Sequence, residues 1–151
     1  MELSASMERF VLHWGEMGTR WGVNRSVAQI HALLYLSPNP LPAEEIAEIL
    51  GIARSNVSTS LKELQSWKLV RLSHALGDRR DHFTTETDLW QLLLTIVEER
   101  KQREIDPTLA VLRQCVDEAE DDPHTPKQVK RRLTRMLDFM EAPAYVGHGF
   151  F

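Results

Sequence analysis

The chain has 151 residues, of which 42% are hydrophobic and 26% are charged, and its formal net charge is −4. This length supports one domain, or one core domain with a helical appendage, and the composition excludes collagen-like and wholly disordered chains. A single cysteine cannot close an intramolecular disulfide, and neither a membrane span nor a signal peptide is visible. We therefore expect a cytoplasmic protein with no membrane partner.

The charge is distributed unevenly along the chain. Residues 54–82 hold six basic and three acidic side chains, whereas residues 83–122 hold eleven acidic and four basic ones. A polyanion should therefore be drawn to one part of the surface, even though the protein as a whole is acidic.

The first third of the chain predicts two helices. Apolar residues recur at helical spacing over residues 3–14, although Gly15 and Gly18 should weaken this helix. A second amphipathic helix follows and ends before the Pro-rich stretch 38–42, because proline cannot continue a helix. The candidate N-caps of the second helix are Asn24 and Ser26.

The most informative segment is residues 43–73. Ala47, Gly51 and Val57 stand in a short helix, in the turn after it and in the next helix. Residue 47 should be small because the helices cross closely, residue 51 should tolerate positive φ, and Val57 should fill the gap between the helices. This spacing predicts a helix-turn-helix whose second helix covers residues 53–68.

The second helix of this pair has two different sides. Val57, Leu61 and Leu64 share an apolar side that should face the core. The other side is polar and nearly free of acids, since only Glu63 intrudes. Asparagine can pair with adenine and hydroxyls can bond to either strand, so this side suits the major groove of DNA. Its members are Arg54, Ser55, Asn56, Ser58, Thr59 and Lys62.

Two short strands, over residues 69–73 and 81–85, should pair as a hairpin around the Gly-Asp turn at residues 77–78. The tip of the hairpin carries Arg79 and Arg80. Taken alone, two arginines on a turn could equally belong to an ordinary solvated turn. Beside a groove-reading helix, they favour a wing that touches phosphate or a minor groove.

The second half of the chain predicts long helices. The apolar stripe over residues 89–116 exceeds what a monomer of this size needs, and it favours a coiled-coil-like dimer seam. The Asp-Pro pair at 106–107 interrupts the stripe and predicts a kink or two abutting helices. A last helix should begin near Thr125 with Gln128 completing a capping box, and residues 142–151 should form a loose tail.

These motifs resemble a known family. The segment LPAEEIAEILGIARSNVSTSLKELQSWKLVRLSHALGDRRDHF is similar to the winged helix-turn-helix of the MarR superfamily, and the preceding HWGEMGTRWGVNRSVAQIHALLYLS resembles its GbsR branch. The resemblance covers about residues 7–115 and implies a homodimeric, sequence-specific transcription regulator of bacteria or archaea. One departure is Ala53, since the family often has serine or threonine at this N-cap, and the loss costs about 1 kcal/mol. By this resemblance Ser55, Asn56, Ser58 and Thr59 match the recognition helix, and Arg79 and Arg80 match the wing.

An enzyme is not supported by the sequence. His13 and Glu16 share a helix face, but no further ligand pair with metal spacing follows. His74 and His82 flank the wing and could approach across the hairpin, although a polar hairpin is the simpler interpretation. Cys115 lies on an apolar stripe and is expected to be a buried structural thiol. No P-loop, nucleophile elbow or dinucleotide fingerprint occurs, so we expect no catalytic residue, metal or cofactor.

A small effector is a further hypothesis. Most aromatic side chains should belong to the core, but the GbsR branch is associated with osmoprotectant or choline-related genes, and aromatic cages bind quaternary ammonium well. The candidate effector residues, between the winged domain and the dimer helices, are Trp14, Trp21 and Trp90.

The sequence thus predicts a mainly α protein with a small β-hairpin wing and long dimerisation helices. We expect an N-terminal helix and arm over residues 1–24, a winged helix-turn-helix over 25–86 and a helical dimerisation region over 87–141. The expected partners are double-stranded DNA, a second copy of the chain and a small-molecule effector. The alternative is a winged-helix module whose recognition face contacts another protein.

Overall fold

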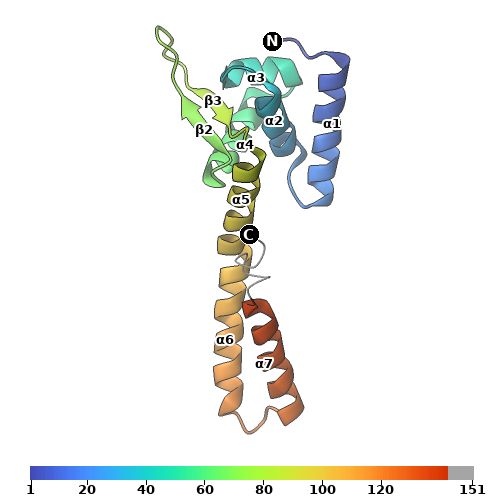
Figure 1. The fold of residues 1–151 in the computed structure, drawn as a ribbon, viewed down its shortest axis with the longest axis vertical. Helices are drawn as coiled ribbons and strands as arrows, with labels where there is room; N and C mark the ends of the chain where they lie inside the picture. The colour runs from blue at the N-terminus through green and yellow to red at the C-terminus, as the bar shows by residue number, and fades with distance from the viewer. Residues whose placement is uncertain (143–151) are drawn as a thin grey trace. The chain divides into compact units, whose positions relative to one another are not determined.

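The computed structural model describes residues 1–142, which form helices and one small sheet (Figure 1). This confirms the predicted fold class, a mainly α protein with a small β wing. The chain divides into two compact units, residues 1–95 and the residues from 96 onward. The helices are α1 (Ala5–Arg20), α2 (Arg25–Leu36), α3 (Ala43–Leu50), α4 (Arg54–Ser66), α5 (Leu89–Arg100), the π-helical turn η1 (Lys101–Ile105), α6 (Asp106–Glu120) and α7 (Lys127–Glu141), and the strands are β1 (Leu41–Pro42), β2 (Val70–Ser73) and β3 (His82–Thr85).

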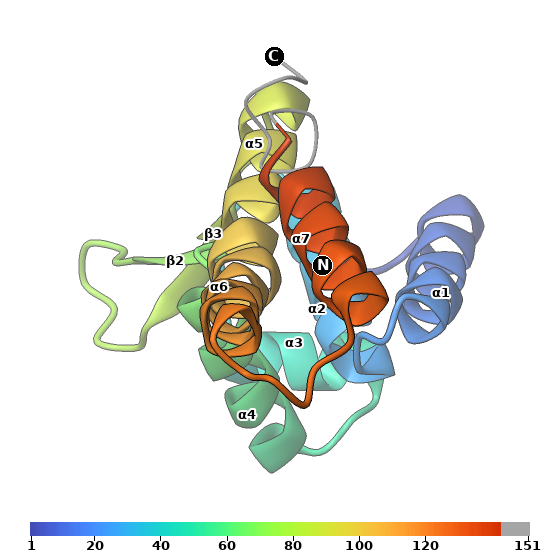
Figure 2. The ribbon, with the colours of Figure 1, turned by 90° about the horizontal axis from the view of Figure 1, so that it is seen from below.

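Helices α1 and α2 lie side by side (Figures 1 and 2), and two glycines let them approach. A Cβ atom on Gly18 would lie 2.6 Å from the Cβ of Ala28, and one on Gly15 would lie 2.8 Å from the Cγ of Gln29. The sequence predicts only that these glycines weaken α1, but the helix continues through both of them to Arg20. Their physical role is the close helix crossing, which a larger side chain would block.

The core of the first unit is built from α2, α3 and α4. Asn24 is the N-cap of α2, and its side chain accepts a hydrogen bond from the backbone N–H of Ser26 over 2.9 Å, so of the two candidate caps the first is correct. The apolar side of α4 packs onto α2 and α3, as its spacing predicts. The largest fully buried side chains are Ile30, Leu33, Ile46, Leu61, Leu64, Val27 and Val57.

The sheet is antiparallel and has the strand order β1-β3-β2. The hairpin of β2 and β3 follows the prediction, with Leu72 opposite Phe83. Strand β1 comes from the Pro-rich stretch, in which the sequence indicates only the end of a helix. It pairs with the other edge of β3 and places Leu41 opposite Phe83. A buried hydrogen bond of 2.6 Å from the Thr85 hydroxyl to the Leu69 carbonyl closes the base of the hairpin.

The helical path from α5 to α6 is continuous. The π-helical turn η1 joins the two helices, and Ile105, the residue before α6, keeps helical backbone angles. In place of a kink or two separate helices at the Asp-Pro pair, the structure has this π-helical turn just before it, and Asp106 lies inside the helix rather than at an N-cap. Pro107 falls in the first turn of α6, where its missing N–H costs little.

Helix α7 packs against α6 after a short turn, and this turn is built differently from the prediction. Pro126 is the N-cap of α7 and makes no side-chain cap bond, so Thr125 and Gln128 form no capping box. The Thr125 hydroxyl instead donates to the carboxylate of Asp122 over 2.9 Å, and the backbone N–H of His124 donates to the same group over 2.9 Å. These two bonds hold the pKa of Asp122 below its usual value.

Two further predictions concern a membrane span and the C-terminal tail. Among residues 1–142, no helix is both long and apolar enough to cross a bilayer. The predicted C-terminal tail lies outside the described residues, apart from Ala142.

Candidate nucleic-acid interface

The turn between α3 and α4 has the geometry that the helix-turn-helix pattern predicts. Gly51 adopts φ +66°, in the left-handed region, and its backbone N–H donates to the carbonyl of Ala47. The N–H of Ile52 donates to the same carbonyl over 3.2 Å. Ala53 is the N-cap of α4 and supplies no side-chain bond, as its methyl group dictates. The glycine thus lets the chain turn sharply enough for α4 to begin at Arg54.

Helix α4 turns a polar side outward. Val57, Leu61 and Leu64 are buried beneath it. Ser58 is half-buried on the flank of the polar side. The other predicted members of this side are all exposed, namely Arg54, Ser55, Asn56, Thr59 and Lys62.

The amide of Asn56 is held by its own protein. Its Nδ2 donates to the hydroxyl of Ser26, near the start of α2, over 2.9 Å. Its Oδ1 accepts a 3.3 Å hydrogen bond from the hydroxyl of Ser60. An asparagine that pairs with adenine uses both amide atoms, so these two bonds would have to open.

Two other members of the polar side bond within α4. The Thr59 hydroxyl donates to the carbonyl of Ser55 over 3.1 Å. The Arg54 guanidinium donates to the hydroxyl of Ser58. These contacts orient the side chains along the helix and leave them facing solvent.

The loop between β2 and β3 projects away from α3 and α4 (Figures 1 and 2). Gly77 makes its turn with φ +81°. Arg79 is exposed and has no ion pair within residues 1–142. Arg80 donates to Asp78 from Nη2 over 2.8 Å and from Nε over 3.1 Å. These hydrogen bonds hold the pKa of Asp78 well below its usual range. The two wing arginines therefore differ, since the second is fixed by a carboxylate of its own loop.

The two histidines of the hairpin each contact a neighbouring aspartate. His74 Nε2 lies 3.2 Å from the Oδ1 of Asp81. His82 is buried, with Nδ1 3.0 Å from the carbonyl of Arg80 and Nε2 3.5 Å from the Oδ2 of Asp78. Within the described residues, no group of three or more potential ligands is placed to hold a metal ion.

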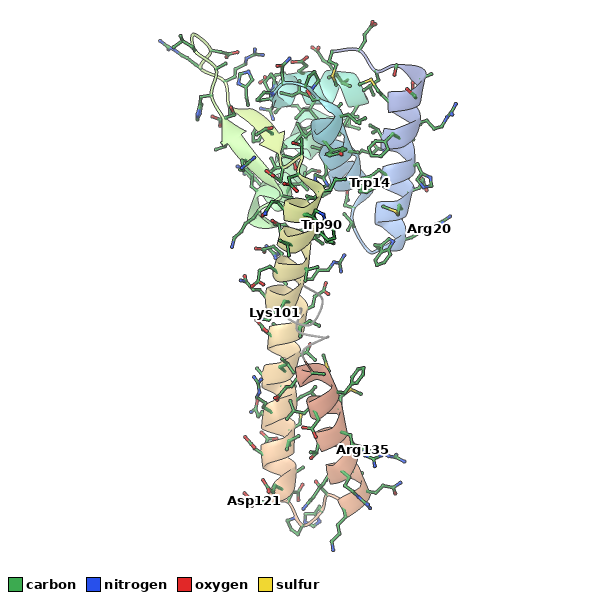
Figure 3. The ribbon with its side chains drawn as sticks, viewed as in Figure 1. Trp14, Arg20, Trp90, Lys101, Asp121 and Arg135 are labelled. Atoms are coloured by element: carbon green, nitrogen blue, oxygen red, sulfur yellow. The ribbon has the colours of Figure 1, made fainter. Side chains whose placement is uncertain are left out.

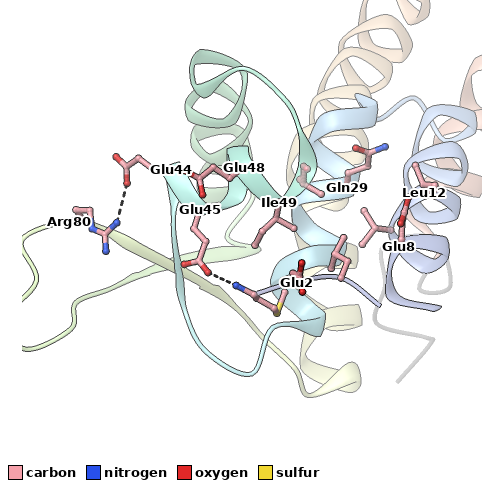
Figure 4. Close-up of a pocket in the computed structure, with 13 residues that line it drawn as sticks. Glu2, Glu8, Leu12, Gln29, Glu44, Glu45, Glu48, Ile49 and Arg80 are labelled. Carbon is pink, nitrogen blue, oxygen red and sulfur yellow. Dashed lines mark hydrogen bonds and ion pairs between the residues drawn. The ribbon is translucent and has the colours of Figure 1, made fainter. Parts of the chain in front are cut away.

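Glu44 is a residue of this surface that the sequence analysis misses. Its Oε1 lies 3.6 Å from Nη2 of Arg54, and its Oε2 lies 3.7 Å from Nη1 of Arg80 (Figure 4). A feature of the sequence that could have pointed to Glu44 is the acidic first turn of α3, which also contains Glu45. The sequence cannot pair an acid of one helix with arginines on the next helix and on a distant loop.

A cavity of about 710 Å³ lies between the start of the chain, α1 and α3 (Figure 4). Five glutamates line it. One of them, Glu45, forms an ion pair with the amino group of Met1, with 2.9 Å between its Oε1 and the Met1 nitrogen. Leu3, Val11 and Ile49 are among its apolar lining residues. The predominance of carboxylates makes this cavity unfavourable for phosphate.

The three predicted effector tryptophans do not line this cavity. Trp14 stacks on Phe10, with ring centroids 5.5 Å apart and an angle of 28° between the planes. Trp21, which follows α1, is 70% exposed, and Trp90 is 68% exposed. Figure 3 labels Trp14 on α1 and Trp90 near the start of α5. An aromatic cage from these three side chains remains a prediction.

Residues 21–81, from the end of α1 to the wing, match the MarR family model. This part of the chain is therefore similar to MarR-family winged helices. The MarR resemblance predicted from the motifs is confirmed by this match.

Two named relatives and one solved structure are also similar to this chain. The chain is 20% identical over 131 residues to the HTH-type transcriptional repressor GbsR of Bacillus subtilis (strain 168), a match that covers 81% of this chain and 69% of that protein. It is also 20% identical over 89 residues to the putative HTH-type transcriptional regulator YvaV of the same strain, covering 59% and 50% of the two chains. The crystal structure of a transcriptional regulator has the same fold, with a TM-score of 0.73, 21% identity and coverage of 89% and 88%.

Proposed function

We propose that the protein is a sequence-specific DNA-binding transcriptional regulator that acts as a homodimer on a pseudo-palindromic operator. The observation that carries this proposal is the exposed polar side of α4 beside a projecting wing with an unpaired Arg79, within residues 1–142. A helix presenting hydroxyl, amide and cationic groups can enter a major groove, while a neighbouring arginine reaches the backbone.

Within this proposal the two parts of the chain have different tasks. Residues 25–86 bind DNA, and residues 87–141 join two copies. In α4, Asn56 reads a base after leaving Ser26, whereas Lys62 and the arginines contact phosphates. The two copies of α4 then enter successive major grooves, roughly 34–36 Å apart.

Exposed apolar side chains support the homodimer. In α5, no apolar side chain is buried within the described residues, and large ones face water. Contiguous exposed apolar surface of this kind is typical of an interface, and a self-complementary patch gives a twofold dimer. The exposed large apolar residues of α5, α6 and α7 are Leu89, Trp90, Leu93, Leu94, Val111, Val129, Met136 and Phe139.

The proposed mode of action is repression by occlusion of a promoter. The relative GbsR, which is 20% identical to this chain, carries the name of a repressor. Its name supports repression rather than activation. An effector or partner that changes the separation of the two winged helices would release the DNA. Trp14, Trp21 and Trp90 remain the hypothetical effector residues, and isothermal titration with choline or betaine tests them directly.

The proposal is tested with the DNA upstream of the gene for this protein. Fluorescence anisotropy at moderate salt should give an affinity at least about 10³-fold tighter than for a random duplex of equal length. Footprinting should then show two protected half-sites whose centres lie about 10 base pairs apart. Equal affinity for both duplexes would exclude sequence-specific binding, and failure to bind either would favour a module that contacts another protein.

A further inference from the structure

Glu44 links the two elements that the proposed function places on DNA. It is in the first turn of α3, and its two carboxylate oxygens lie 3.6 Å from Arg54 and 3.7 Å from Arg80. Figure 4 shows the Glu44 carboxylate pointing out of α3 toward the wing arginine. One carboxylate therefore pairs with a cation of the recognition helix and with a cation of the wing.

The position of Glu44 leaves its carboxylate accessible. The N-terminus of α3 presents free N–H groups, which stabilise negative charge in the first turn. The Glu44 side chain is 53% exposed, so a large polyanion can reach the same place. The two guanidinium groups are also oriented by other contacts, Arg54 by Ser58 and Arg80 by Asp78.

We propose that Glu44 sets the affinity of the protein for DNA by occupying, between Arg54 and Arg80, the place that a backbone phosphate takes in the complex. Carboxylate and phosphate both present anionic oxygens that guanidinium groups bind. To bind at this place, DNA must either displace the Glu44 carboxylate from the two arginines or hold its own phosphates close to this negative charge. The inference rests on the proposed function, because it names a residue that adjusts the strength of that same interface.

The consequence falls mainly on non-specific binding. Phosphate contacts supply nearly all the affinity of a regulator for random DNA, whereas base contacts add to it at the operator. A carboxylate that competes for two phosphate-binding arginines therefore weakens random binding. The protein then spends less time on DNA that is not its operator.

Glu48 provides a matched control. It lies on the same helix, lines the same cavity and is exposed, but within residues 1–142 it forms no ion pair with an arginine. Glu44→Gln and Glu48→Gln change the net charge of the protein by the same amount. A difference between them reports the contacts to Arg54 and Arg80.

The test measures anisotropy of a labelled random-sequence duplex over a range of salt concentrations. At low salt, Glu44→Gln should bind about fivefold more tightly than the wild type, while Glu48→Gln should change the affinity by less than about twofold. In a background carrying both Arg54→Ala and Arg80→Ala, the two glutamine variants should bind equally. Circular dichroism melting checks that all variants remain folded.

The remaining outcomes separate this inference from the proposed function. If Glu44→Gln binds the duplex no more tightly than Glu48→Gln, the inference is wrong, and wild-type DNA binding still supports the proposed function. A gain that persists without both arginines also overturns it, because the charge would then act through other groups. If neither the wild type nor any variant binds a duplex, both ideas fail.

Discussion

Helices α2 and α7 differ sharply in how they are packed. Helix α2 buries seven residues against its neighbours, whereas α7 buries none within the described part of the chain. The first unit, residues 1–95, therefore has an apolar core of its own. Apolar side chains of the later helices remain in water unless another surface covers them. We infer that core substitutions change the stability of the first region within a single chain. The state of the second region instead depends on protein concentration, because its exposed apolar side chains are covered only by assembly.

The largest expected effect comes from the core of the winged helix. Leu61 is 2% exposed, so Leu61→Ala should lower the free energy of unfolding by about 2–5 kcal/mol through lost burial and a cavity. Urea denaturation followed by circular dichroism measures this change. Leu76→Ala is the control, because this wing residue is 107% exposed and its truncation should stay within about 0.5 kcal/mol. Similar losses for both variants would contradict an independent core.

A pH effect comes from the same region. His31 on α2 is 8% exposed, and its Nε2 has no hydrogen-bond partner within the described residues. Burial lowers its pKa from 6.5 to about 4, so between these values the unfolded chain binds a proton that the folded protein does not. Stability should therefore be unaffected above pH 6.5 and should fall by about 3 kcal/mol as the pH decreases toward 4.

Comparison with a variant isolates this effect from other titrating groups. His31→Leu should remove this part of the pH dependence, whereas His13→Leu, at an exposed position of α1, should keep it. Urea denaturation at several pH values measures both. An unchanged pH dependence in His31→Leu would show that another group titrates.

The second region is tested through assembly. Trp90→Ala should leave the fold of the winged helix intact but weaken the dimer about 10- to 100-fold, because large aromatic side chains contribute most at interfaces. Sedimentation equilibrium over a range of protein concentrations measures the dissociation constant. Leu76→Ala serves again as the control, since it removes an exposed apolar side chain outside the proposed dimer helices. A monomeric wild type would refute the inferred dimer.

The same division explains how much of the molecule could be predicted. Gly51, Val57, Leu61 and Leu64 act through local periodicity and backbone angles, so the sequence alone predicts the helix-turn-helix. Strand β1 forms only by pairing with β3, and nothing in its two residues indicates a strand. Local rules also fail in the turn before α7, where the Thr125 hydroxyl donates to Asp122 and the helix takes Pro126 as its N-cap.

The candidate site shows the same limit. Its polar side could be predicted from the spacing of α4, because exposure follows from the helical period. The contacts that occupy this side could not be predicted, since Ser26 reaches Asn56 from α2 and Glu44 reaches Arg54 and Arg80 from α3. Such pairs depend on how the helices cross. The sequence therefore predicts which residues face solvent, but not which of them already have partners.

The smallest effect concerns the wing and tests both regions together. Arg79 has no ion pair within the described part of the chain, so it is free to neutralise one phosphate. Arg79→Ala should weaken binding to operator and random DNA by similar factors, because a phosphate contact carries no sequence information. It should also reduce the slope of log affinity against log salt by about 1 for each protomer on the DNA. A dimer therefore loses about 2, and a lone winged helix loses about 1. An unchanged slope would mean that the wing does not touch the backbone, whatever the state of assembly.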